Sequence, residues 1–285
     1  MYIVKYILIS MHVFKKIILF FYLFIGSFAF SQTELGLFMG TSFFHGDVGY
    51  NSLNFGNTDK LFINAKAAIG LNFRKNLNSR IAVNFSLKRG EISSFDSNSE
   101  DLFITQRNLD FQSNITEMSS NFEFNFSPYK IGSEKFNKSL YVFTGISGFK
   151  FNPKGYYNGT WVELQPLGTE GQGSFLYPER EKYKLFAIGI PIGIGYKLNL
   201  NDFLALNIAW SWTLTKTDYI DDVSLDYINP NLLSEQAQNL ADKSYSGFEE
   251  GSQRGNSENM DKFGFFGVSF VYKIPKKSFC SQINY

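Results

Sequence analysis

The feature that most constrains this chain is a series of eight stretches of alternating residues, joined in turn by long and short connections. Alternation with a period of two is typical of β-strands, whose side chains point to opposite faces. The stretches begin near Glu34, Phe62, Arg80, Asp110, Leu140, Lys184, Phe203 and Lys262. The short connections are Lys75–Ser79, Ser127–Ser139 and Leu198–Asp202, and the long ones are Phe44–Leu61, Glu91–Leu109, Asn152–Tyr183 and Thr217–Asp261. This asymmetry predicts a chain that crosses one layer up and down, with tight turns on one side and large loops on the other.

The two faces of these stretches differ in character. In the second stretch Ile69 and Phe73 lie on an apolar face, while Arg74 lies on the other. The sixth and seventh stretches repeat the pattern, with Ile190 and Trp210 on their apolar faces. The less apolar faces also carry Lys66, Arg74, Lys88, Glu117, Glu123 and Lys197. Since eight strands leave a lumen that side chains fill, small residues and charges that pair across the lumen suit this second face.

Four aromatic residues mark the ends of the strands that descend to the short connections. They are Phe73, Phe126, Tyr196 and Tyr272. Rings at one level form the interfacial girdle of a transmembrane barrel, and strands of about 11 residues match a tilted crossing. We therefore predict an all-β fold over residues 32–273: an eight-stranded antiparallel up-and-down transmembrane β-barrel with short periplasmic turns and long extracellular loops. A secreted β-sandwich, which would also alternate, is the competing interpretation.

The start of the chain predicts export. Lys15 and Lys16 precede an apolar run, Ile17–Ile25, and small residues follow as far as Ser31. This is the pattern of a secretory signal peptide, and the run is shorter than the roughly 20 residues that a spanning helix needs. We expect residues 1–31 to be removed by cleavage after Ser31 and the protein to reach the cell outer membrane.

The two ends of the chain leave smaller questions open. Either Met1 or Met11 is the start of translation. In the last stretch, Gly267–Tyr272 resembles the terminal signal read by the barrel-assembly machinery. Residues 274–285 are then expected to form a periplasmic tail. The single cysteine, Cys280, forms no intrachain disulfide, and its role stays open.

Two local irregularities are expected within the strands. Apolar residues run through Phe111 and Ile115 and then shift phase to Met118, so a β-bulge is predicted near Ile115–Glu117. Pro191 has no N–H to donate to a neighbouring strand, so a second irregularity is expected there.

Residues that carry chemistry are scarce, and we expect no catalytic, cofactor-binding or metal-binding residues. His12 leaves with the signal peptide, so His45 with Ser42 is the only nucleus for a Ser–His pair, and a histidine at a loop base is the simpler interpretation. Gly168–Gly173 does not match G-x-G-x-x-G and opens no helix, so a phosphate loop is not predicted. The formal net charge of +1 gives no indication of a nucleic-acid partner.

An acidic group lies in the last long connection. Its members are Asp218, Asp221, Asp222 and Asp226. Carboxylate oxygens are suitable ligands for calcium, but the EF-hand spacing is missing. A solvated loop base, with carboxylates that cap turns, is the simpler interpretation, and calcium binding stays open.

The same connection predicts a short helix. Asn229 can cap it, and Pro230 suits its first position. An apolar stripe follows, made of Leu233, Ala237, Leu240 and Ala241. Such a stripe must be covered, either by the neighbouring loops or by a partner protein. We expect it to pack over the mouth of the barrel.

Several segments carry a resemblance to a known family. They are Glu34–Gly36, Arg107–Phe111, Ile115–Glu117, Phe122–Phe126, Phe151–Lys154, Trp161–Gly173, Thr217–Ser224 and Gln253–Asn256. In order and along nearly the whole chain, they resemble the PorG-like family of outer-membrane β-barrels, which includes a component of the type IX secretion and gliding machinery. The resemblance implies a non-enzymatic barrel that anchors the periplasmic ring of that protein-transport machine. Its implied partners are outer-membrane lipid and the periplasmic ring proteins.

Two other functions compete with this interpretation. One is an outer-membrane lipid-modifying enzyme, for which His45 would be needed. The other is a barrel whose long loops bind or adhere to a surface. A diffusion pore is the least favoured function, because a filled eight-stranded lumen conducts poorly. The family also contains barrels of unassigned role, so the resemblance does not separate the secretion component from a paralogue.

Overall fold

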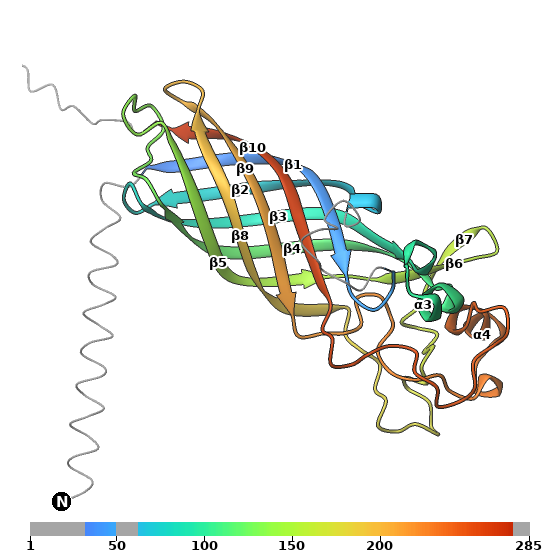
Figure 1. Ribbon diagram of the computed structural model, residues 1–285. Coiled ribbons are helices and arrows are strands. Elements are labelled where there is room, and N and C mark those ends of the chain that lie inside the picture. Colours follow the sequence, from blue (N-terminus) through green and yellow to red (C-terminus); the bar gives the residue numbers. More distant parts are fainter. Residues whose placement is uncertain (1–31, 50–61, 276–285) are drawn as a thin grey trace, which may run out of the picture.

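The computed structural model describes residues 32–49 and 62–275. Its main body is a closed antiparallel barrel of eight strands (Figure 1). The strands are β1 (Thr33–His45), β2 (Lys66–Asn76), β3 (Ile81–Phe95), β4 (Asp110–Asn125), β5 (Lys138–Lys150), β8 (Phe186–Asn199), β9 (Leu204–Thr215) and β10 (Lys262–Ile274). Each barrel strand pairs with the next one along the chain, and β10 pairs with β1 to close the ring. The predicted up-and-down barrel is confirmed.

The connections differ between the two ends of the barrel, as Figure 1 shows. At one end lie the short turns 77–80, 126–137 and 200–203. At the other end lie the long loops, which contain η2 (Asp96–Asn98), α3 (Leu102–Arg107), β6 (Pro153–Tyr157), β7 (Thr160–Glu163), η3 (Pro230–Leu232) and α4 (Glu235–Ala241). The second strand begins at Lys66 rather than near Phe62, because Phe62 and Ile63 belong to a helical turn.

Some predictions fall outside the described residues. The signal peptide at 1–31, the two candidate start codons and Cys280 all do so, as does most of the tail at 274–285. Among the residues that are described, no helix is long and apolar enough to cross a membrane.

The outer wall of the barrel is apolar. Ile69 and Ile190 are 62% and 49% exposed on it, whereas Glu123 is only 1% exposed and lies in the lumen. Trp210 is half-buried because its ring packs against Phe43 on the same wall, with ring centroids 6.5 Å apart. The four predicted aromatic residues of the short-turn end are also exposed: Phe73, Phe126, Tyr196 and Tyr272. The outward direction of the apolar face is therefore as the sequence predicted.

The predicted bulge in β4 is absent. The pairing of β4 with β3 runs without a break from Phe124 opposite Ile81 to Asp110 opposite Phe95, and its register with β5 is equally constant. Phe111 and Ile115 are fully buried. They point into the lumen rather than to the outer wall, so no extra residue is needed. The error arose because the lumen was assumed to be polar along its whole length.

The irregularity expected at Pro191 is present. The pairing of β5 with β8 stops where Thr144 lies opposite Ile192, and it resumes in the same register where Ser147 lies opposite Gly189. Two positions of each strand are left unpaired between them. Pro191 is one of them, and its pairing with Thr213 of β9 is intact. The gap therefore lies on the β5 side, as expected of a residue that lacks a donor.

A network of ion pairs fills the lumen near the short-turn end. Arg74 contacts Glu34 at 3.0 Å and Glu123 at 2.9 Å, and Lys197 contacts Glu123 at 2.6 Å. The Lys197 ammonium also lies 4.3 Å from the centroid of the Tyr141 ring. These residues come from β1, β2, β4, β5 and β8. The predicted pairing of charges across the lumen is confirmed for this group, which we call the lumen network.

The other predicted lumen charges behave differently. Glu117 accepts a hydrogen bond from Thr213 at 2.6 Å, and the ammonium of Lys88 lies 5.2 Å from the ring centroid of Phe38. Lys66 was predicted to be a lumen charge, but it is exposed. It is the first residue of β2, opposite Ser42, so its side chain reaches solvent beyond the closed part of the barrel.

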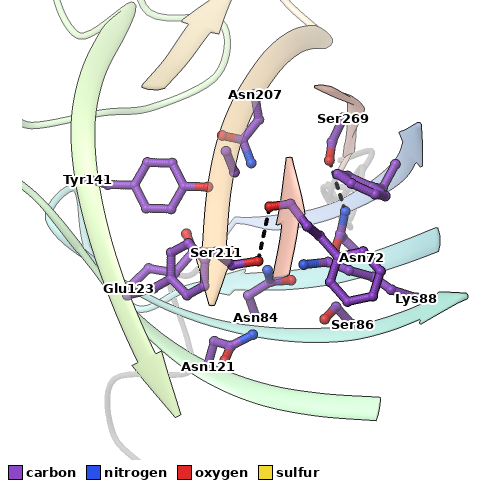
Figure 2. Close-up of a pocket in the computed structure, with 14 residues that line it drawn as sticks. Asn72, Asn84, Ser86, Lys88, Asn121, Glu123, Tyr141, Asn207, Ser211 and Ser269 are labelled. Carbon is purple, nitrogen blue, oxygen red and sulfur yellow. Dashed lines mark hydrogen bonds between the residues drawn. The ribbon is translucent and has the colours of Figure 1, made fainter. Parts of the chain in front are cut away.

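The middle of the lumen contains a small polar cavity of about 20 Å³, shown in Figure 2. Amides and hydroxyls line it, and Asn72 donates a hydrogen bond to Ser269 at 3.1 Å. A space of this size holds about one water molecule. Towards the long loops, a cluster rich in phenylalanine, which we call the aromatic cluster, closes the lumen: Phe38, Phe44, Phe111, Phe149, Phe151, Phe263 and Phe265, with Ile115. The barrel is thus filled by side chains, as eight strands require.

The turn 126–137 closes the opposite end. Tyr129 and Ile131 are buried there against Ala205 and Val271. The amide of Tyr129 donates to the carbonyl of Ser79 at 2.7 Å, which fixes this turn to its neighbour.

Candidate functional site

The long loops fold together into an ordered cap at their end of the barrel (Figure 1). We define the loop cap as residues 46–49, 96–109, 151–185 and 216–261. Two buried arginines, Arg107 and Arg254, lie at its centre. Since buried guanidinium groups need partners for their donors, their contacts define how the loops are held together.

Arg107 connects three loops. It forms an ion pair with Asp96 at 2.7 Å and donates to the carbonyl oxygens of Asp47 at 2.6 Å and Arg254 at 2.5 Å. Arg107 is the last residue of α3, which ends because Asn108 takes a left-handed conformation with φ of 57°. The helix end therefore directs this side chain into the cap rather than into solvent.

Arg254 has a second set of partners. Its guanidinium pairs with the carboxylate of Glu170 at 2.8 Å and donates to the carbonyl oxygens of Asp222 at 2.7 Å and Ala241 at 3.0 Å. Burial lowers the pKa of this guanidinium, but the carboxylates of Glu170 and Asp222 raise it more, so the pKa stays above its ordinary value. Arg254 therefore remains a permanent cation.

The glycine-rich segment serves to position Glu170. Gly168 and Gly171 have φ of 63° and 84°, which residues with a Cβ rarely adopt, and they turn the chain around this side chain. The carboxylate of Glu170 also accepts hydrogen bonds from the amides of Ser224 at 2.9 Å and Leu225 at 3.1 Å. This segment therefore presents a buried carboxylate to the neighbouring loop.

These contacts bring together four segments that carry the family resemblance. They are Arg107–Phe111, Trp161–Gly173, Thr217–Ser224 and Gln253–Asn256. Sequence reasoning did not identify Arg107, Glu170 and Arg254 as partners. One indication of their importance was available from the sequence: each of these charged residues lies in a loop segment that resembles the family.

A cluster of carboxylates lies beside the arginines. Its members are Asp47, Asp218, Asp221 and Asp261, all buried. Burial, together with the carboxylates of Asp221 and Asp47, raises the pKa of Asp218 to about 9. Burial and the nearby Asp47 raise the pKa of Asp221 to about 8. Asp261 has a pKa well above its ordinary value for the same reasons.

The structure divides the acidic group that the sequence suggested for calcium. Asp218 and Asp221 join the cluster above, Asp222 accepts from Thr169 and Tyr183, and Asp226 pairs with Arg180 at 2.6 Å. The expected solvated loop base is wrong for the first three, which are buried because neighbouring loops cover them. No group of three or more His, Cys, Asp or Glu residues in the described part of the chain is arranged to hold a metal ion.

In the candidate Ser–His pair, the serine hydroxyl is bound to the backbone. The hydroxyl of Ser42 is buried and donates to the carbonyl oxygen of Glu91 at 2.6 Å. A hydroxyl proton held by a backbone acceptor is not directed to a general base. His45, at the end of β1, is buried beneath the cap.

The predicted loop helix is present, but it starts later. Asn229 caps only the short turn η3, and Ser234 caps α4 by accepting a hydrogen bond from Ala237. Ala237 and Leu240 are buried, and a Cβ on Gly155 would lie 2.7 Å from the Leu240 side chain. The part of the stripe on α4 therefore packs on β6 within the cap and is covered by neighbouring loops, whereas Leu233 is only half-buried.

Comparison with known proteins identifies a family. The sequence model described as "Domain of unknown function (DUF6089)" matches residues 12–282. No curated protein matches the chain.

Among solved structures, the chain is similar to Ail of Yersinia pestis, with 11% identity over 86% of this chain and 99% of Ail, at a TM-score of 0.40. It is also similar to Neisserial surface protein A, with 8% identity over 85% of this chain and 97% of that protein, at a TM-score of 0.41. The similarity to OprG of Pseudomonas aeruginosa has 10% identity over 85% of this chain and 96% of OprG, at a TM-score of 0.40.

Proposed function

We propose that this chain, which belongs to the DUF6089 family, is a non-enzymatic barrel of the outer membrane that serves as an anchor for other proteins. The apolar outer wall supports a position in the bilayer, since such a continuous surface is not stable in water. The filled lumen argues against a pore. From the short-turn end to the loop end it contains ion pairs, a cavity of only about 20 Å³ and the aromatic cluster.

One observation carries the anchoring role: both ends of the barrel are built as ordered surfaces. At the long-loop end, Arg107 and Arg254 join the loops into a cap. At the short-turn end, the turn 126–137 is fixed beneath the barrel by Tyr129 and Ile131. An ordered surface binds a partner without the entropic cost of ordering its loops first. We infer, from the resemblance to the PorG-like family, that the partner is the periplasmic ring of the type IX secretion machinery.

Photo-crosslinking from the two ends tests this proposal. A photoreactive residue replaces Glu134, which is exposed in the turn 126–137, or Phe175, which is 95% exposed in the cap. After irradiation in cells, the tagged barrel is purified and its adducts are identified by mass spectrometry. We expect periplasmic ring proteins to be captured from Glu134 and not from Phe175. Deletion of the gene should then abolish secretion by this route, and normal secretion would contradict the proposal.

The exposed aromatic residues of the cap favour a second candidate function. Phe175 and Tyr245 are almost entirely exposed at the loop surface, where such side chains are typical of interface anchors. Capture of a surface protein or glycan from Phe175, with nothing captured from Glu134, would favour loop-mediated surface binding or adhesion over the secretion role.

A further inference from the structure

A broad apolar groove of about 800 Å³ runs along the outer wall of the barrel. Its sides are formed by Met118, Ile146, Phe186, Ile188, Ile190 and Leu214, from β4, β5, β8 and β9. All six side chains are exposed. The volume lies within the range of about 300–1,000 Å³ that is usual for ligand sites.

Two small residues, Gly148 and Ser120, lie among the large side chains that line the groove. Gly148 of β5 lies between Met118 on one neighbouring strand and Ile188 on the other. Ser120 of β4 lies opposite Ile146. Both residues line the groove, and the ring of Phe186 lies over Gly148, where an added Cβ would meet it at 2.9 Å. Ser120 is therefore the position at which a larger side chain is missing.

Two cations lie just beyond the groove, towards the loop cap. Thr116 is two residues from Met118 on the same face of β4, and it pairs with Arg89 on one side and Lys150 on the other. Since adjacent strands are about 4.8 Å apart, the backbones of Arg89 and Lys150 are about 10 Å apart. Both side chains are exposed.

A third cation, Lys216, lines the rim of the groove itself. Within the described residues, Arg89, Lys150 and Lys216 form no ion pair. The acidic residue of this face beside them is Glu91, two positions from Arg89, and its carboxylate accepts a hydrogen bond from Gln112 at 2.7 Å. The rim therefore has an excess of positive charge directly above an apolar hollow.

We propose that this groove is the binding site of a phosphorylated lipid with several acyl chains, of the lipid A class. The acyl chains occupy the hollow, and the phosphates contact Arg89, Lys150 and Lys216. A guanidinium binds phosphate through paired hydrogen bonds, and the ammonium groups add charge. Three cations match a headgroup that carries more than one phosphate. This inference rests on the proposed position of the barrel in the outer membrane.

Native mass spectrometry of the full barrel in a neutral detergent tests the site. The protein is titrated with lipid A that carries two phosphates, with phosphatidylglycerol and with phosphatidylcholine. We expect one lipid A to bind at least about tenfold more tightly than either phospholipid. The double variant Arg89→Ser, Lys150→Ser should lose about tenfold to a hundredfold in lipid A affinity, because it removes two contacts of exposed cations; this loss corresponds to about 1.4–2.8 kcal/mol in total.

Two further variants separate charge from shape. Lys138→Ser removes an exposed cation at the opposite end of β5 and should leave the affinity unchanged. Ser120→Phe places a ring in the groove and should weaken binding while the three cations remain. The heat-dependent shift of a folded barrel in electrophoresis shows that each variant folds. Equal binding of phosphatidylglycerol, or unchanged affinity in the double variant, would overturn the proposal.

Fractionation of the cell membranes, followed by the lipid titration, distinguishes this site from the proposed function. If the barrel fractionates with the outer membrane and lipid A shows no preference, the lipid site alone is wrong. If the barrel is absent from the membrane fraction, both proposals are wrong.

Discussion

The lumen network and the loop cap both bury charged side chains, but they balance the charges differently. In the lumen, two carboxylates contact two cations at 3.0 Å or less. In the cap, seven buried carboxylates face only two buried guanidinium groups. The seven are Asp47, Asp96, Glu170, Asp218, Asp221, Asp222 and Asp261. A buried charge without a partner is far more costly than a paired one, so the cap is the region that should respond to pH.

This difference matches the roles proposed for the two regions. A balanced network inside a closed wall gives the barrel a single rigid arrangement, which suits an anchor. An acidic excess in a loop region is stable only while some of the carboxyl groups stay protonated. The cap is therefore expected to loosen as its carboxyl groups ionise, whereas the lumen is not. Three changes test this contrast.

The largest effect is expected in the lumen, from Glu123→Gln. Glu123 contacts both Arg74 and Lys197, so its neutralisation leaves one buried positive charge without a partner. Removing one member of a buried ionic group costs about 3–5 kcal/mol. Urea unfolding of the barrel in lipid vesicles, followed by tryptophan fluorescence, measures this loss.

The double variant Glu123→Gln, Lys197→Met serves as its control. Since it removes one charge of each sign, it should lose less stability than the sum of the two single variants. Additive losses would show that the two residues do not act as a pair.

A somewhat smaller effect, about 3 kcal/mol, is expected from Arg254→Met in the cap. Glu170 and Asp222 then lose their cation, but the loops can relax partly into water. Limited proteolysis should become much faster in the loops while the barrel stays folded. Arg180→Met is the matched control: the Arg180–Asp226 pair is partly exposed, so its loss should cost less than about 1 kcal/mol. Unfolding of the whole barrel by Arg254→Met would contradict the separation of the two regions.

The third effect is a loss of cap stability as the pH rises. The pKa of Asp218 is raised to about 9 and that of Asp221 to about 8, from an ordinary value of 3.8. Carboxyl groups with a raised pKa in the folded state stabilise it fully below the ordinary value, and this contribution is lost as the pH rises through the folded values. Hydrogen exchange at the amides of Val48 and Ile220, which donate to Asp221 and Asp261, should lose at least about tenfold in protection between pH 6 and pH 9.

The variant Asp218→Asn sharpens this test. It removes one carboxyl group of the cluster, so the protection of the same amides should depend less on pH. Amides of the barrel strands serve as the internal reference, because the lumen charges are balanced. If the strand amides lose protection by the same factor as the cap, the contrast between the two regions is wrong.

Much of the barrel could be predicted from the sequence, because the period of two is a local property. It gave the outward positions of Ile69 and Ile190 and the inward position of Glu123. It failed at Phe111 and Ile115, where apolar residues point inward. The reason is that one polarity was assumed for the whole lumen, whereas the aromatic cluster closes the part near the loops.

The cap could not be predicted in the same way, since its contacts join residues far apart in the chain. Arg254 contacts Glu170, which is 84 positions away in the sequence, and Arg107 contacts Arg254, which is 147 positions away. No periodicity links such residues. For the same reason, the prediction that Asp218 and Asp221 are solvated is wrong. Their burial depends on the packing of other loops, which no local sequence pattern indicates.

The smallest effect is expected from Pro191→Ala in the barrel wall. The new N–H can restore a hydrogen bond across the gap between β5 and β8, worth about 0.5–1.5 kcal/mol. Loss of the proline raises the entropy of the unfolded chain, which offsets about 0.4–1 kcal/mol. The net change in unfolding free energy should therefore stay within about 1 kcal/mol. Slow exchange at the new amide would show that the missing donor causes the gap. Fast exchange would show instead that the curvature of the closed barrel separates the two strands there, whichever residue is present.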